Sequence, residues 1–215
     1  NGSFENLATV VVADTSLTAT ELTDAIDDAN TVTGTTDTVF TITAVDTITG
    51  SEANFTDLLD DETAEQISIT DQDLTVNDGE ISVTNANLLN GTTTGTVTAT
   101  IDAGTRVDDL KTLNGSNAYT ITIDNADATG STATEFNTIN SATTVAIDAS
   151  AVTGLASDDI EDIKTLLNDA TDANQFANGS FENLATVVVA DTSLSGSDLA
   201  DAIDDANSLT GTTDT

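Results

Sequence analysis

NGSFENLATVVVADTSL, residues 1–17, returns letter for letter as residues 178–194. The identity continues with seven substitutions to the end of the chain, at positions equivalent to 18, 19, 20, 21, 23, 31 and 32, so that the last 38 residues repeat the first 38. We therefore divide the chain into one complete unit, 1–177, and the start of the next identical unit, 178–215. A long-period repeat that is cut within a unit predicts a much longer parent polypeptide.

A shorter cycle recurs inside the unit. Each cycle has a β-branched run of period two, an Asp, a turn rich in Thr, Gly and Ser, and a short segment with apolar residues at helical spacing. The first cycle predicts a strand at 8–13 and a helix at 21–29, with Thr20 as its N-cap. The second predicts a helix near 52–60 that is capped by Ser51 and buries Phe55, Leu58 and Leu59. The last predicts a helix at 158–167 capped by Ser157, and acid pairs on the helices, such as Asp158-Asp159, are expected on a solvated face.

Stacking of such cycles predicts the fold class. One strand and one short helix cannot bury their apolar faces alone, but stacked copies can. We therefore predict an α/β solenoid, a repeat protein with parallel strands on one wall and one short helix per turn on the other. Thr occupies most outward strand positions and would line the exposed sheet face. One cycle departs from the pattern, because Asn77-Asp78-Gly79 predicts a tight turn between two short strands.

Composition excludes several classes of partner. The chain has 38 acidic and three basic residues, and its net charge is −35. Nucleic acids and anionic membranes both bind basic surfaces, so neither is expected. No apolar run approaches the ~20 residues of a membrane-spanning helix. The partners we expect are copies of the same chain and divalent cations.

Without His or Cys the usual general bases and nucleophiles are missing, so we do not expect an enzyme.

An Asp directly after each predicted strand is the one polar position that recurs. If the strands stack in register, these carboxylates form a ladder with ~4.8 Å between neighbours. Ca²⁺ takes six to eight oxygen ligands and would bridge them, so we predict a candidate calcium ladder. The candidate ligands are Asp14, Asp46, Asp71, Asp102, Asp124, Asp148 and Asp191.

Two other interpretations of the acids stay open. Each Asp can instead form an Asx turn, in which its carboxylate accepts backbone N–H groups and ends the strand. An acid-rich, lysine-poor surface is also typical of proteins from saline environments. The chain contains neither an EF-hand loop nor the glycine-rich calcium nonapeptide, so a calcium site would have to be assembled between strands.

The cycles TVTATIDAGTRVDDLKTLNG (96–115) and YTITIDNADATG (119–130) resemble giant repetitive cell-surface proteins of marine cyanobacteria. Those chains also alternate V-T-V-like strands, an Asp, a T-G turn and a helix with L-x-x-I/L spacing, and they are poor in Cys, Met and basic residues. The resemblance implies an extracellular or surface-layer role, often with calcium.

From the residues and the resemblance together we expect a structural extracellular protein. It would be a segment of a long repetitive filament, surface layer or adhesin stalk. The alternative is an adhesin whose Thr-lined sheet face binds carbohydrate, ice or another surface. A carbohydrate-degrading β-helix enzyme is a third hypothesis, and it requires an isolated pair of carboxylates in a groove.

Overall fold

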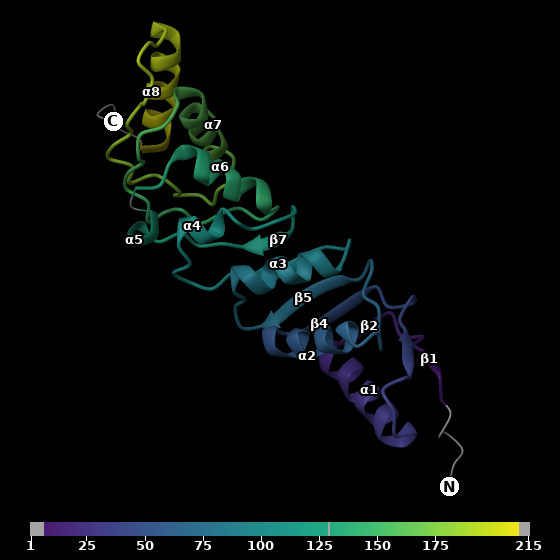
Figure 1. Ribbon diagram of the computed structural model, residues 1–215. Coiled ribbons are helices and arrows are strands. Elements are labelled where there is room, and N and C mark those ends of the chain that lie inside the picture. Colours follow the sequence, from purple (N-terminus) through teal and green to yellow (C-terminus); the bar gives the residue numbers. More distant parts are fainter. Residues whose placement is uncertain (1–6, 129, 211–215) are drawn as a thin grey trace. The chain divides into compact units, whose positions relative to one another are not determined.

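The computed structural model describes residues 7–128 and 130–210. The chain forms two compact units, Asn1–Thr100 and Ile101–Thr215 (Figure 1). In the described part of the first unit, the larger sheet is open and has the strand order β2-β4-β5-β6. Its strands pair in parallel: β2 (Ser16–Thr18), β4 (Thr47–Ser51), β5 (Asp73–Asp78) and β6 (Val97–Thr100). A smaller parallel sheet joins β1 (Thr9–Val11) to β3 (Val39–Thr41).

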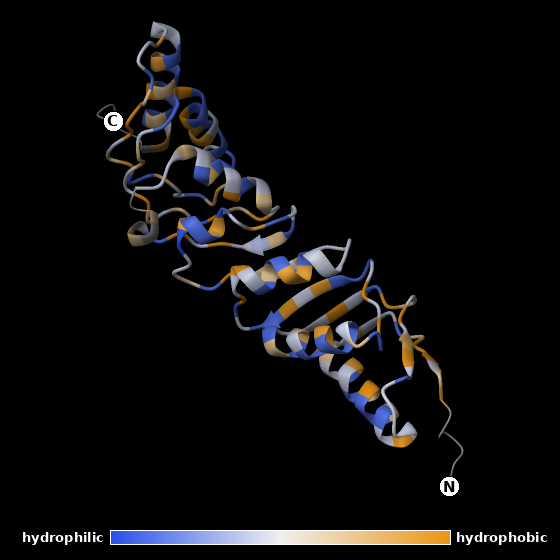
Figure 2. Cartoon of the chain, in the orientation of Figure 1, coloured by the Kyte–Doolittle hydropathy of each residue, from blue (hydrophilic) through white to orange (hydrophobic). Residues whose placement is uncertain are grey.

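The register of the larger sheet separates an apolar face from a polar one. Leu17 pairs with Ile48, Ile48 with Leu74 and Leu74 with Val97, and the last three of these side chains are fully buried. Because side chains alternate along a strand, the intervening residues point to the opposite face. The same alternation of hydrophobic and hydrophilic residues is visible along β4 and β5 in Figure 2. The aliphatic row is therefore the sheet's contribution to the core.

Helices pack onto this core through aliphatic and aromatic side chains. In the first unit they are α1 (Ala19–Thr33), α2 (Glu52–Thr63) and α3 (Val83–Thr92). Leu22, Ile26, Phe55, Leu58 and Leu89 are at most 2% exposed. Each helix begins directly after a Thr or Ser whose hydroxyl accepts the N–H three residues on, which satisfies one of the free donors of the first turn.

The second unit contains one strand, β7 (Ala118–Thr120), and five helices among its described residues. They are α4 (Val107–Leu110), α5 (Asn125–Ala128), α6 (Ala133–Ala142), α7 (Ile160–Ala170) and α8 (Gly196–Thr210). Its core includes an aromatic cluster in which the ring of Phe181 lies edge-on to Phe136 and Phe176. Isolated parallel bridges, such as Gly154 to Thr186 and Asp158 to Val189, connect the extended segments between the helices.

The predicted solenoid is wrong. The described strands form open parallel sheets with helices packed on them, and none of these sheets is closed or curled. The physical reason is that alternating strands and helices also build βαβ units, in which successive parallel strands lie side by side in an open sheet. The period of a strand–helix cycle is the same in both architectures, so the period alone could not separate them.

Three local predictions are also corrected. The first helix begins after Thr18, not Thr20, because Thr18 and Glu21 form a complete capping box. The residue three positions after Thr20 is Thr23, which cannot complete such a box. The helix α7 begins after Asp159, not Ser157. The predicted hairpin at Asn77-Asp78-Gly79 does not form, because the residues that follow enter α3. The helix capped by Ser51 is confirmed.

Two glycines near the end of α3 give a matched test of packing. A Cβ on Gly95 would lie 2.5 Å from the carbonyl oxygen of Gln72, so Gly95→Ala forces the backbone apart and should cost about 1–3 kcal/mol. Gly91 lies in α3, and a Cβ there would meet nothing within 4 Å, so Gly91→Ala should stabilise by about 0.4–1 kcal/mol. Urea denaturation of both variants measures the difference, and effects of the same sign would contradict this packing.

Candidate functional site

A row of threonines crosses the sheet of the first unit on the face opposite the buried aliphatic row. Thr18 pairs in register with Thr49, Thr49 with Thr75, and Thr75 with Thr98. Thr98 is exposed and the other three are half-buried. Neighbouring strands lie about 4.7–4.9 Å apart, so a hydroxyl and a methyl group repeat at this spacing along the threonine row. Such a row can offer regularly placed hydroxyls to a sugar or to ordered water.

Carboxylates from one element cap the helix of another. In the first unit, Glu52 at the start of α2 accepts hydrogen bonds from the backbone N–H and hydroxyl of Ser82, at 3.2 and 3.1 Å, and from the amide of Asn85 at 2.7 Å. Partial burial acts to raise the pKa of Glu52, but these hydrogen bonds outweigh it and hold the pKa below its usual value. An ionised carboxylate thus fixes the beginning of α3 to that of α2.

This contact predicts a pH-dependent effect of Glu52→Gln. The variant should lose about 1–2 kcal/mol of unfolding free energy at neutral pH, since an amide replaces a charged acceptor of three hydrogen bonds. The fold lowers the pKa of Glu52, so its contribution is present above the ordinary value of 4.5 and is lost as the pH falls through the lower folded-state value. The gap between the variant and the native chain should therefore close in acid.

Urea denaturation of Glu52→Gln at a series of pH values measures this gap. Glu65→Gln is the matched control, because the side chain of Glu65 is exposed. A gap that stays constant down to acid pH would show that the charge of Glu52 does not matter.

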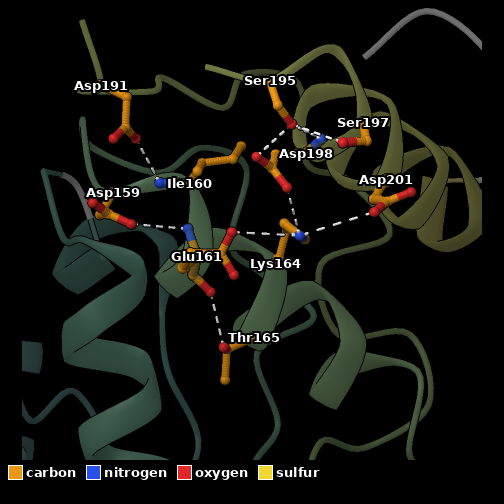
Figure 3. A network of polar contacts seen from close by, with 10 residues as sticks. All are labelled: Asp159, Ile160, Glu161, Lys164, Thr165, Asp191, Ser195, Ser197, Asp198 and Asp201. Atoms are coloured by element: carbon orange, nitrogen blue, oxygen red, sulfur yellow. Dashed lines mark hydrogen bonds and ion pairs between the residues drawn. The ribbon is translucent and has the colours of Figure 1, made fainter. Parts of the chain in front are cut away.

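The second unit repeats this kind of capping with different residues. Asp158 accepts the backbone N–H and the hydroxyl of Thr134 in α6, at 2.7 and 2.8 Å. Burial opposes ionisation of Asp158, but the hydrogen bonds lower its pKa overall. Asp191 accepts the N–H of Ile160, the first residue of α7, at 2.8 Å (Figure 3). An anion at a helix N-terminus is favoured by the helix dipole as well as by the hydrogen bonds.

Lys164 joins α7 to α8 through a network of acids (Figure 3). Its Nζ lies 3.5 Å from Glu161, 3.5 Å from Asp198 and 3.9 Å from Asp201. Desolvation acts to lower the pKa of Lys164, but the neighbouring carboxylates raise it overall. The hydrogen bond from the Ser195 hydroxyl, at 2.6 Å, and the contact with Lys164 lower the pKa of Asp198.

Lys111 makes an equivalent connection between Asp108 of α4 and Glu135 of α6. The hydrogen bonds to Asp108 and then Glu135 raise the pKa of Lys111 well above its usual value. Two of the three basic residues of the chain are thus each shared between acids of different helices. These lysines serve helix packing, which leaves most of the acidic surface to be neutralised from solution.

The structure does not bring the predicted calcium ligands together as a ladder. The backbone N–H of Asp46 donates to the carbonyl of Thr15, and the carbonyl of Asp46 accepts from the N–H of Asp73. Asp148 forms a parallel bridge with Thr122. None of these partners is another residue of the predicted ladder. Five of its seven members are exposed (Asp14, Asp46, Asp71, Asp102 and Asp124), and Asp148 and Asp191 are half-buried.

The alternative role as a turn residue fits Asp148, whose carboxylate accepts the N–H of Ser150 at 3.0 Å. Within residues 7–128 and 130–210, no group of three or more His, Cys, Asp or Glu side chains is placed to hold a metal ion. Calcium binding by these aspartates stays a prediction. In the same described part, no helix is both long and apolar enough to cross a membrane.

Comparison of the chain with protein-family models, with curated proteins and with solved structures gave no match.

Proposed function

We propose that the chain is a structural protein of the cell exterior, a segment of a long repetitive filament, surface layer or adhesin stalk. The observation that supports this role is that the repeated sequence folds into the same element at the same offset. Helix α1 spans Ala19–Thr33 and α8 spans Gly196–Thr210, so their ends lie 177 residues apart, which is the offset of the repeated sequence.

The repeated helix keeps the same capping hydrogen bond at its start in both copies, although both residues that form it differ. In α1 the hydroxyl of Thr18 accepts the N–H of Glu21, at 3.1 Å, and in α8 the hydroxyl of Ser195 accepts the N–H of Asp198, at 3.1 Å. The substitutions from Thr to Ser and from Glu to Asp retain a hydroxyl and a carboxylate at these two positions. Repetition of one folded block adds length to a protein without adding a new site, as a filament or stalk requires.

The proposed role can be tested on the cell that makes the protein. Antibodies raised against the chain should label intact cells, and immunogold electron microscopy should show the label in a continuous layer or along fibres at the surface. Labelling that appears only after the cells are permeabilised would contradict an extracellular role.

We also propose that calcium is a partner of the acidic surface. Support comes from the excess of 38 acids over three bases, with two of those bases already shared between carboxylates. Thermal unfolding followed by circular dichroism in chelator, Ca²⁺, Mg²⁺ and NaCl should show the largest rise in midpoint with Ca²⁺. A site filled at 100 times its Kd stabilises by about 2.7 kcal/mol. Equal effects of the three salts would mean screening alone.

A second candidate function, binding to carbohydrate or ice, is favoured by the in-register threonine row. Thr75→Val keeps the shape of the row but removes one hydroxyl, and Thr75→Arg blocks the row. If the row binds a polysaccharide through hydroxyls, both variants should weaken binding in a pull-down assay. Retention of both variants at the native level would exclude this face.

A further inference from the structure

The two copies of the repeated block have different surroundings. In the first copy, Ser16–Thr18 forms β2 and pairs with β4, and α1 packs against α2. In the second copy, the equivalent residues 193–195 form no strand. Leu22 and Ile26 of α1 are 1% and 0% exposed, whereas the equivalent Leu199 and Ile203 of α8 are 42% and 41% exposed. These two positions of the repeated helix are therefore covered in the first copy and exposed in the second.

An apolar groove lies beside the open face. Its volume is about 230 Å³, and its lining consists of aliphatic side chains from α7, from α8 and from the extended segment at 187–189. On the same side of α8, Ala202 and Ala206 also line the groove, but they are only 7% and 4% exposed because α8 packs on α7. The network of Lys164 in Figure 3 holds the two helices together. The groove and the exposed Leu199 and Ile203 therefore form a preformed surface.

The backbone of the repeated strand shows which edge is free. In the second copy, the N–H groups of Ala185 and Ala190 and the carbonyls of Thr186 and Val188 bond to residues 153–158. In the first copy, the carbonyl of Ala8 and the N–H of Val12 bond to residues 39–41. Ala8 is equivalent to Ala185 and Val12 to Val189, so the two copies use different backbone groups of the same strand. One strand can therefore pair on both edges at once.

We propose that the open face of α8 and the free edge of residues 185–190 bind a segment with the sequence of residues 39–63, joined directly after the repeated block. The first copy shows this segment in place. Its strand β3 pairs with β1, its strand β4 pairs with β2, and its helix α2 packs on α1. Phe40, Ile48, Phe55 and Leu58 of this segment are at most 4% exposed there. This inference rests on the proposed role of the chain as part of a repetitive structure, and it names the partner of its open end.

Two properties of the open face favour this segment: its side chains are the same as those that the segment meets in the first copy, and the face is apolar. Leu22, Asp24, Ala25, Ile26 and Ala29 are unchanged in α8, so the segment would meet the same side chains in both places. A basic partner would be drawn to the acidic surface by charge, but the groove itself is aliphatic and matches apolar side chains.

Thiol labelling tests the inference, because the chain contains no Cys. Leu199→Cys introduces a single exposed thiol on the open face. We compare its labelling rate in the 215-residue chain with its rate in the same chain extended by a second copy of residues 39–100. The extension should slow labelling at least about tenfold, since burial requires an opening step before reaction. Leu22→Cys, at the equivalent covered position, gives the reference rate for a buried thiol.

An unchanged rate in the extended chain would overturn the inference, whether or not circular dichroism shows that the extension has folded. A rate that is already slow in the 215-residue chain and rises on dilution would mean that a second copy covers the face, and would overturn the choice of occupant. Neither result depends on where the protein is located, so failure here is distinct from failure of the surface-labelling test.

Discussion

Phe181→Ala should destabilise the second unit by about 3–5 kcal/mol, the largest effect that we expect from a single substitution. Phe181 is fully buried, and its ring lies 5.4 Å from that of Phe136 and 5.3 Å from that of Phe176, in edge-on geometry. Such pairs add about 0.5–1.5 kcal/mol beyond the burial of area. The backbone of Phe181 has φ of 60°, a conformation that non-glycine residues adopt at a cost and that this packing maintains.

The measurement is urea denaturation followed by tyrosine fluorescence. Tyr119 is the single tyrosine of a chain without tryptophan, and it is buried in the second unit, where burial raises its pKa to about 12. It therefore reports unfolding of the unit that contains Phe181. Val188→Ala is the control in the same unit, because Val188 is 43% exposed and its truncation should change stability by less than about 0.5 kcal/mol. A loss below about 1 kcal/mol for Phe181→Ala would contradict the aromatic core.

Ile26→Ala and Ile203→Ala should have very different effects although the two isoleucines occupy the same position of the repeated block. Ile26 is fully buried, so its truncation should cost about 2–5 kcal/mol. Ile203 is 41% exposed and has fewer contacts to lose, so its truncation should cost no more than about 1 kcal/mol. Urea denaturation of both variants measures the losses. Equal losses would show that the face of α8 is covered in solution.

The sequence was sufficient for the alternation of strands and helices and for one of the helix caps, because these depend on residues close in the chain. Ser51 was identified as a helix cap from its own neighbours, and the pattern of Phe55 and Leu58 predicted the buried face of α2. The coiling of the sheet was predicted wrongly, because whether strands close around a core or form an open sheet depends on packing between distant segments.

The threonine row was only partly visible in the sequence, since the register between strands decides which residues meet. Paired residues are 31 positions apart between β2 and β4, 26 between β4 and β5, and 23 between β5 and β6. These unequal steps bring Thr18, Thr49, Thr75 and Thr98 into one row because each follows an aliphatic residue that pairs in register with its neighbours. The same steps leave Asp46 beside Thr15 and Asp73, away from the other predicted ligands.

The capping acids were missed for a related reason. Glu52 and Asp158 bond to Ser82 and Thr134, which lie 30 and 24 residues away in the chain. An acid at a helix start is expected from local rules, but its partner on another helix is set by how the helices pack. The pair Asp158-Asp159 was therefore predicted to lie on a solvated face, although Asp158 accepts hydrogen bonds from Thr134 in α6.

Hydrogen exchange of the 215-residue chain tests most directly whether one repeated block is closed by its neighbours in the first copy and open in the second. Residues 22–29 and 199–206 differ only at Thr23 and Ala200, so their amides have nearly the same intrinsic exchange rates. We expect residues 22–29 to exchange much more slowly than residues 199–206, because α1 is covered by α2 and β4 and the equivalent face of α8 is exposed. Equal protection of the two helices would contradict the open end on which the proposed assembly depends.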